Sequence, residues 1–313
     1  MEELETKYPC RSKFIRSLFD LIGNTEECFP RAIFVYGHAG TGKTCIVKDF
    51  MSLIENEKTR CVLINCVECY STKILLENIL DGLFYKRELQ GDQERCESLQ
   101  EFIKYFQKCN SNNTQRNYVI AFDDAERIRD MEYSILPSLL RIQELTGLNV
   151  CVILISQIPF EKYHLRTGLT DVITLQCPQY SKAETLTILG TQFKIARRLL
   201  KIHINELWES EEIRNKENIL QYDIVEKITY EFFCNYLNAF LSVFYKACRD
   251  VPELKMTANK LFLTYIEPVL NGSIEITEIS KLWRNIASPL RTALSQVYMR
   301  SDDFNKVCDF KII

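Results

Sequence analysis

Short apolar runs alternate with amphipathic stretches along the first 178 residues of the chain. The apolar runs are rich in Val, Ile, Phe and Cys and are nearly continuous, which is typical of strands buried on both faces. Strands separated by helices predict a parallel sheet with helices on both sides, and a ligand site at the carboxyl ends of the strands. The five strands are expected at residues 32–36, 61–65, 118–122, 149–155 and 171–175.

The stretches between these strands carry apolar residues at helical spacing. Helices are predicted over residues 45–55, from Ser71 as the N-cap to about residue 83, over 99–106, and over 134–146. From residue 181 the strand signals largely vanish, and the remaining sequence is rich in Phe, Tyr and Leu at helical spacing. The chain is therefore expected to form an α/β domain over residues 1–178 and a helical domain over 179–313, including C-terminal helices.

Composition places the chain among ordinary soluble globular proteins, with 46% hydrophobic and 26% charged residues. The net charge of −3 gives no global attraction to nucleic acid, so any DNA contact needs a local patch or partner chains. The polar, acidic residues 1–7 argue against a signal peptide, and the 13 cysteines are then expected as reduced thiols. One C-x-x-C pair, Cys66 and Cys69, has no second pair or His pair at zinc spacing.

The segment after the first predicted strand reads GHAGTGKT and fits the phosphate-binding loop G-x-x-x-x-G-K-[ST]. Small residues let the main chain curl so that successive N–H groups point at phosphate oxygens, and the following helix adds its N-terminal partial charge. Lys43 is expected at the β- and γ-phosphates of ATP, and the Thr44 hydroxyl on Mg²⁺. The loop consists of Gly37, His38, Ala39, Gly40, Thr41, Gly42, Lys43 and Thr44.

Two aspartates follow the third predicted strand. Asp123 is the expected second Mg²⁺ ligand and is expected to act through water. Many active ATPases with this loop carry Glu at the next position to activate water, whereas Asp124 is one methylene shorter. Because a displacement of about 1 Å can cost on the order of 100-fold in rate, Asp124 is a doubtful base and slow or absent hydrolysis is expected. Asp124 would work if the main chain were shifted, and Glu126 is expected to point elsewhere.

Three further residues are candidates for phosphate contacts. Ser156 ends the fourth predicted strand and could sense the γ-phosphate or only form a turn. Arg166 lies where a trans-acting arginine finger would stand, or is merely solvated, and Arg249 could reach the phosphates from the helical domain. Four basic residues at helical spacing could meet DNA phosphates, but a solvated face is favoured because acidic residues follow at once. These four are Lys194, Arg197, Arg198 and Lys201.

Several segments together resemble the initiator-type AAA+ proteins of the eukaryotic origin recognition complex. They include YGHAGTGKT, NCVECYSTKILLENIL over residues 65–80 and KLWRNIASPLRTALSQVYMR over residues 281–300. Further segments are RDMEYSILPSLLRIQEL over 129–145, FYKACRDVPEL over 244–254 and the stretch Tyr8 to Arg11. The likeness runs from about residue 8 to 300 and implies an AAA+ doubly wound sheet followed by an all-helical lid domain.

The resemblance also implies a role. Related AAA+ subunits form an arc around duplex DNA, bind ATP between neighbours and load the replicative helicase in the nucleus. The subunit that these segments most resemble binds ATP but is not thought to be the main hydrolytic engine. By position, Lys43, Thr44, Asp123 and Ser156 inherit the phosphate, Mg²⁺, Walker B and sensor roles. Pro9 to Arg11 would lie near the adenine.

Two departures from the family pattern stand out. A winged-helix domain of about a hundred further residues is expected in the family, and none follows residue 313. Residues 190–222 look longer and more charged than expected, and their length has no physical account.

The leading hypothesis is an ATP-binding scaffold subunit, in which ATP is mainly structural. The alternative is a free-standing P-loop ATPase or kinase, and a third possibility is a chain that assembles poorly and acts as a competitor.

Overall fold

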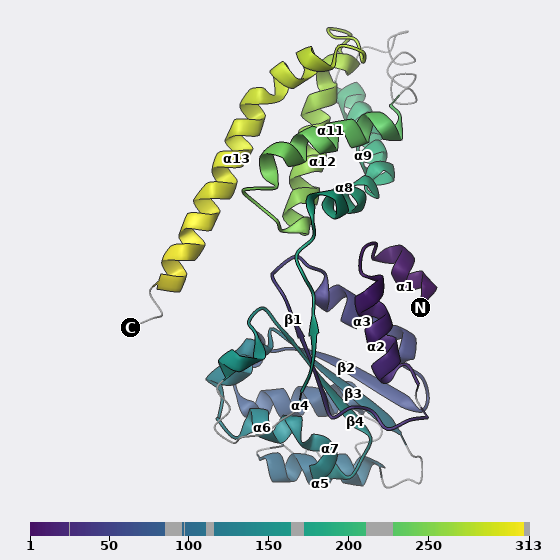
Figure 1. Ribbon diagram of the computed structural model, residues 1–313, viewed down its shortest axis with the longest axis vertical. Coiled ribbons are helices and arrows are strands. Elements are labelled where there is room, and N and C mark those ends of the chain that lie inside the picture. Colours follow the sequence, from purple (N-terminus) through teal and green to yellow (C-terminus); the bar gives the residue numbers. More distant parts are fainter. Residues whose placement is uncertain are drawn as a thin grey trace. The chain divides into compact units, whose positions relative to one another are not determined.

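The computed structural model describes residues 1–24, 26–84, 96, 98–110, 116–163, 172–210 and 228–309 of the 313-residue chain (Figure 1). The chain divides into two compact units, Met1–Gln179 and Tyr180–Ile313. Within the described ranges, no helix combines the length and the apolar character needed to cross a bilayer.

The first unit is built on a five-stranded sheet in the order β2-β3-β4-β1-β5, in which all paired strands are parallel. The predicted doubly wound parallel sheet is therefore confirmed. The centre of the sheet is fully buried, because Ala121, Ile153 and Ile33 stand in register with no exposed surface. The strands are β1 Ala32–Tyr36, β2 Thr59–Asn65, β3 Asn117–Asp123, β4 Val150–Ser156 and β5 Ile173–Gln176.

Helices cover both faces of this sheet, and successive strand residues pack into different cores (Figure 1). On one face, Phe34 and Phe122 pack against the helices that follow β2 and β3. On the other face, Ile33 and Ala121 pack against the N-terminal helices and the helix after β1. The helices are α1 Glu2–Lys7, α2 Ser12–Ile22, α3 Lys43–Ile54, α4 Thr72–Leu83, α5 Leu99–Asn110, α6 Ile135–Leu140 and α7 Ile142–Thr146, with 3₁₀ turns η1 Ala125–Asp130 and η2 Phe160–Tyr163.

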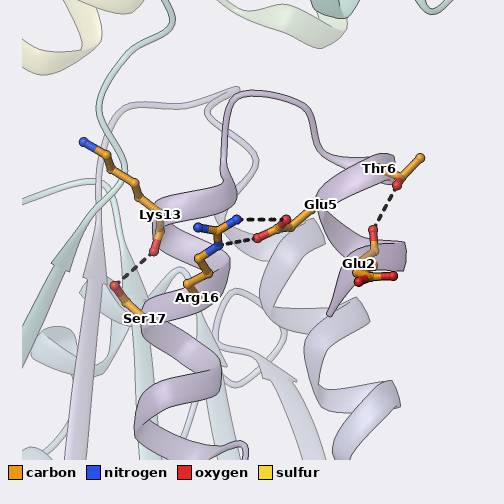
Figure 2. Close-up of polar contacts among 6 residues, drawn as sticks. All are labelled: Glu2, Glu5, Thr6, Lys13, Arg16 and Ser17. Carbon is orange, nitrogen blue, oxygen red and sulfur yellow. Dashed lines mark hydrogen bonds and ion pairs between the residues drawn. The ribbon is translucent and has the colours of Figure 1, made fainter.

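The N-terminal helices α1 and α2 were not foreseen from the sequence. The buried residues Phe14, Leu18 and Ile22 are spaced by four and give α2 its apolar face. Figure 2 shows how the two helices are joined: the Arg16 guanidinium donates to both carboxylate oxygens of Glu5, at 2.7 and 3.4 Å. This surface pair fixes α1 against the start of the helix that follows it.

One predicted helix was wrong in its extent. The stretch 134–146 forms two short helices, α6 and α7, separated at Arg141. The Arg141 N–H bonds to the Ser138 carbonyl, three residues back, and this tighter 3₁₀-type bond ends α6 early. The helix predicted over 99–106 was also too short, because α5 runs on to Asn110. The remaining boundaries differ from prediction by at most two residues. Ser71 caps α4 through the Ile74 N–H, and Gly147 closes α7 with φ 68°.

The second unit is helical in its described part, as predicted for the lid. Its core is aromatic, with the Phe233 and Phe262 rings 4.9 Å apart and Trp283 stacked on Tyr236 at 5.7 Å. On α9, Lys194, Arg198 and Lys201 are exposed and Arg197 is half-buried. Part of the unexplained stretch 190–222 lies outside the described residues. The helices are α8 Lys182–Gly190, α9 Phe193–Ser210, α11 Tyr230–Phe244, α12 Val251–Leu270 and α13 Ile279–Asp309.

Candidate functional site

The predicted phosphate loop lies between β1 and α3, at the carboxyl edge of the sheet. Gly37 has to be glycine because a Cβ there would stand 2.2 Å from the Cys177 carbonyl oxygen. Gly42 forms the N-cap of α3 with φ 90°, a left-handed conformation that favours glycine. The loop therefore curls tightly against the segment after β5 and delivers the start of α3 to the sheet edge.

Lys43 is buried, and its ammonium group binds carbonyl groups of its own loop. Its Nζ donates to the Gly37 carbonyl at 2.6 Å and to the His38 carbonyl at 2.8 Å. Burial lowers the Lys43 pKa, and the charges of Cys177, Glu126 and Asp123 oppose that shift. An ammonium group held among loop carbonyls and facing acidic side chains is ready to exchange those carbonyls for phosphate oxygens.

Thr44 and Asp123 meet directly, as the two halves of a Mg²⁺ site should. The Thr44 hydroxyl donates to Asp123 Oδ1 at 2.8 Å. Burial raises the Asp123 pKa, which Thr44 and Lys43 partly offset. A hydroxyl and a carboxylate are hard oxygen ligands and suit Mg²⁺, which takes few protein ligands and completes its shell with water and phosphates. In the described part of the chain, no group of three or more His, Cys, Asp or Glu side chains is placed to hold a metal.

Asp124, the doubtful base, sits at a sharp bend directly after β3. Its φ of 49° and ψ of 46° are left-handed, and its side chain makes no capping bond to η1. Asp tolerates this conformation better than most residues. The sequence left open that a shifted main chain could let Asp124 act as the base, and the main chain is indeed unusual here. The catalytic role of Asp124 stays a prediction.

Ser156 lies beside the phosphate loop and is fully buried. Its carbonyl accepts a hydrogen bond from the Gly37 N–H at 3.3 Å, and its hydroxyl accepts one from the Ile158 N–H at 3.1 Å. The second bond is the one that a turn-forming serine makes. Because its hydroxyl hydrogen can still be donated, the sensor role also stays a prediction.

The segment before α2 packs onto the phosphate loop from outside. Arg11 is only 4% exposed, and its guanidinium donates to the Thr41 carbonyl at 3.2 Å and to the Pro178 carbonyl at 2.6 Å. The resemblance placed Pro9 and Arg11 near the adenine, and the link of Arg11 to the loop itself was missed. This link spans 167 residues for the bond to Pro178, a separation that no local pattern reveals.

The contacts of the phosphate loop do not test the two remaining predicted arginines. Arg166 lies outside the described residues. Arg249 belongs to the second unit, where its guanidinium carbon stands 5.2 Å from the centre of the Tyr245 ring. Its predicted reach to the phosphates stays a prediction.

Sequence reasoning missed Tyr163, which ends η2 just after β4. Tyr163 is 5% exposed, and its ring packs edge-on against Phe34 with centroids 5.4 Å apart. The only sequence signal is an aromatic pair three residues apart behind Ser156. Phe160 and Tyr163 stack with centroids 5.8 Å apart.

Comparison with known proteins places this geometry in a family. Residues 7–153 match the AAA ATPase domain family, and residues 233–300 match the family described as ORC5, lid domain. The chain is 46% identical over 299 residues to origin recognition complex subunit 5 of Drosophila melanogaster, covering 95% of this chain. It is 32% identical over 305 residues to the subunit of the same name from Homo sapiens, covering 96% of this chain.

A solved structure agrees with these relatives. A chain in the structure of Drosophila ORC bound to DNA superposes with a TM-score of 0.81 at 44% identity, covering 95% of this chain and 70% of that one. The chain spans 62% of the length of both curated relatives. A parallel sheet with a phosphate loop, followed by a helical lid, defines an initiator-type AAA+ domain. Within that class, the chain belongs to the origin recognition complex subunit 5 family.

Proposed function

We propose that the chain is an ATP-binding subunit of the origin recognition complex. It helps to assemble that complex on replication-origin DNA in the nucleus, where the complex loads the replicative helicase. ATP with Mg²⁺ is mainly structural, and hydrolysis by this chain is weak or absent.

The observation that carries this proposal is the hydrogen bond between Thr44 and Asp123 at 2.8 Å. It brings together the hydroxyl and the carboxylate that would hold Mg²⁺, at the end of the loop whose Lys43 would bind the phosphates. Bound Mg²⁺ would neutralise phosphate charge. The chain's own groups hold the nucleotide in place, with Thr44 and Asp123 as ligands and the loop N–H groups as donors.

The partners follow from the relatives. The relatives are named as subunits of the origin recognition complex, and the Drosophila complex was solved bound to DNA. With a net charge of −3, this chain has no general affinity for DNA, so DNA contact would come through the assembled complex. The helicase-loading role and the nuclear location are carried over from that family.

The structural role of ATP rests on Asp124. Its carboxylate is one methylene shorter than the usual catalytic Glu, and activation of water depends on reach. A ligand that binds the folded chain, and binds the docked chain most tightly, stabilises the state that it prefers. For a ligand with no affinity for the other state, this amounts to about 2.7 kcal/mol when its concentration is 100 times its Kd. ATP would then stabilise the assembled complex by binding to it, without needing to be hydrolysed.

The test compares two lysines on the same helix. Lys43→Ala removes the buried ammonium group, whereas Lys48→Ala removes an exposed one and serves as the control. Each variant is co-expressed with the neighbouring subunits, purified, and its nucleotide extracted and quantified. We expect wild type and Lys48→Ala to retain ATP, and Lys43→Ala to lose it and to assemble less.

Two results would contradict the proposal. Unchanged assembly of Lys43→Ala would show that ATP does not hold the complex together. Turnover by the purified chain faster than about one per second, as typical enzymes show, would favour a free-standing ATPase or kinase.

A further inference from the structure

Three polar side chains gather at the sheet edge next to the phosphate loop. Ser156 ends β4, Tyr163 lies in η2 just beyond it, and Glu126 lies in η1 just after β3. Strands β3 and β4 are neighbours, with Phe122 paired to Leu154, so η1 and η2 leave the same edge. The Gly37 N–H bond to the Ser156 carbonyl places that edge against the phosphate loop.

The Tyr163 hydroxyl is fixed in place and lacks a good partner. Its ring is held by Phe34 at 5.4 Å and Phe160 at 5.8 Å, and the Arg129 guanidinium carbon stands 5.8 Å from the ring centre. The hydroxyl oxygen is buried and makes no hydrogen bond of good geometry among the described residues. Burial raises the pKa of Tyr163 well above its usual range and the nearby Ser156 hydroxyl lowers it, so the phenol is neutral and can donate.

Glu126 supplies the complementary group. Its Oε2 is buried and also has no hydrogen-bond partner in the described part of the chain. The Glu126 charge raises the pKa of Tyr163 and opposes the lowering of the Lys43 pKa by burial, so the carboxylate acts electrostatically on both groups. Buried polar groups without a protein partner are usually satisfied by an ordered water.

We propose that Glu126 and Tyr163 form, with one ordered water, a hydrogen-bonded relay that positions the Ser156 hydroxyl toward the γ-phosphate. The inference deepens the proposed function and rests on it. The water donates to Glu126 and to the Tyr163 oxygen, and Tyr163 donates to Ser156 Oγ. Ser156 also accepts from the Ile158 N–H, so both its lone pairs are used and its own hydrogen is left for a phosphate oxygen.

The relay makes Glu126 and Tyr163 positioning residues for one phosphate only. The loop N–H groups act on the β-phosphate and Thr44 acts on the metal, which ATP and ADP share, whereas Lys43 reaches both the β- and the γ-phosphate. The relay acts on the γ-phosphate, which ATP has and ADP lacks. Loss of the relay should therefore change the ratio of ATP to ADP affinity, which a general loss of packing would leave unchanged.

The test measures Kd values for ATP and ADP with Mg²⁺ by calorimetry on the full 313-residue chain. Tyr163→Phe removes only the hydroxyl, and Tyr133→Phe makes the same change at a side chain that is 90% exposed. We expect Tyr163→Phe to raise the ATP Kd about three- to tenfold, the effect of one hydrogen bond, and to leave the ADP Kd within about twofold. Tyr133→Phe should change neither value.

Two more variants complete the test. Glu126→Gln should also lower the ratio of ATP to ADP affinity. The double variant Tyr163→Phe with Ser156→Ala should raise the ATP Kd no more than Ser156→Ala alone, because the residues act as one unit. Unchanged ATP-to-ADP ratios in Tyr163→Phe and Glu126→Gln, or additive effects in the double variant, would overturn the relay alone. A wild-type chain that binds neither nucleotide would overturn the proposed function, and the relay with it.

Discussion

The Thr44 hydroxyl and the Asp123 carboxylate lie 2.8 Å apart although 79 residues separate them in the chain. The bond joins the first turn of α3 to the end of β3. If these oxygens hold Mg²⁺ as proposed, the bond keeps them together before the metal binds, which would lower the cost of organising them.

Replacing Thr44 by Val keeps the shape of the side chain and removes the hydroxyl. We expect the ATP Kd in the presence of Mg²⁺ to rise about tenfold or more, because a metal ligand and its bond to Asp123 are both lost. Chelation with EDTA should weaken ATP binding by wild type and have little further effect on Thr44→Val. Thr187→Val, at an exposed position of α8, is the control, and an EDTA response equal to wild type in Thr44→Val would contradict the metal role.

Asp123→Asn should weaken Mg²⁺-dependent ATP binding and raise the free energy of unfolding of the nucleotide-free chain. Burial raises the folded-state pKa of this carboxyl above its ordinary value of 3.8. A raised acid pKa means that the folded chain binds the proton more tightly, so stability is present at low pH and is lost as pH rises through the folded pKa. Asp123→Asn removes this cost and keeps an oxygen that can accept from Thr44. The nucleotide-free variant should gain about 0.5–2 kcal/mol at neutral pH while losing Mg²⁺-dependent ATP binding.

The pH dependence of that gain is the decisive measurement. Denaturant unfolding of wild type and Asp123→Asn should differ most above about pH 6, and the difference should shrink as the pH falls toward the ordinary value of 3.8. A gain that stays constant over this range would show that the carboxylate charge is not its cause.

Two arginines five positions apart should respond very differently to removal. Arg11 is buried and donates to the carbonyls of Thr41 and Pro178, so Arg11→Gln should lower the free energy of unfolding by about 2–3 kcal/mol through unpaired buried groups. Arg16 is 61% exposed and pairs with Glu5 on the surface (Figure 2), so Arg16→Gln should change the free energy of unfolding little. Equal losses in urea unfolding would contradict the structural role of Arg11.

Two glycines offer a similar contrast. A Cβ at Gly37 would collide with the Cys177 carbonyl, whereas one at Gly147 would have no atom within 4 Å. Gly147→Ala should then lower the free energy of unfolding only by the strain of placing Ala at a left-handed φ, about 1–2 kcal/mol. Gly37→Ala should cost about 3 kcal/mol and also abolish ATP binding, since the loop itself must move. Retained ATP binding in Gly37→Ala would show that the loop tolerates the displacement.

The sheet could be predicted because a strand that is buried on both faces needs apolar residues at nearly every position. All seven residues of β4 are buried, and the strand was predicted within one residue. β5 lies at the sheet edge, where three of its four residues are exposed, and its predicted position was two residues early. The exposed edge lacks the apolar signal on which such a prediction depends.

The site was predictable only where its contacts are local in sequence. The phosphate loop and its spacing to Lys43 lie within eight consecutive residues, 37–44. The packing of Arg11 on Thr41 and Pro178 depends on how β1 and β5 pair, and the burial of Tyr163 depends on Phe34, which lies far away in the chain. These contacts arise from the tertiary fold, which single-residue patterns do not encode.

The position of Arg11 bears on how shortened versions of this chain should be designed. A fragment trimmed to begin at the first strand would keep every residue of the phosphate-binding motif. It would nevertheless lack the Arg11 guanidinium, which donates to the Thr41 carbonyl of the loop. Motif boundaries are therefore a poor guide to where such a fragment can start, because the segment before α2 also supports the phosphate loop.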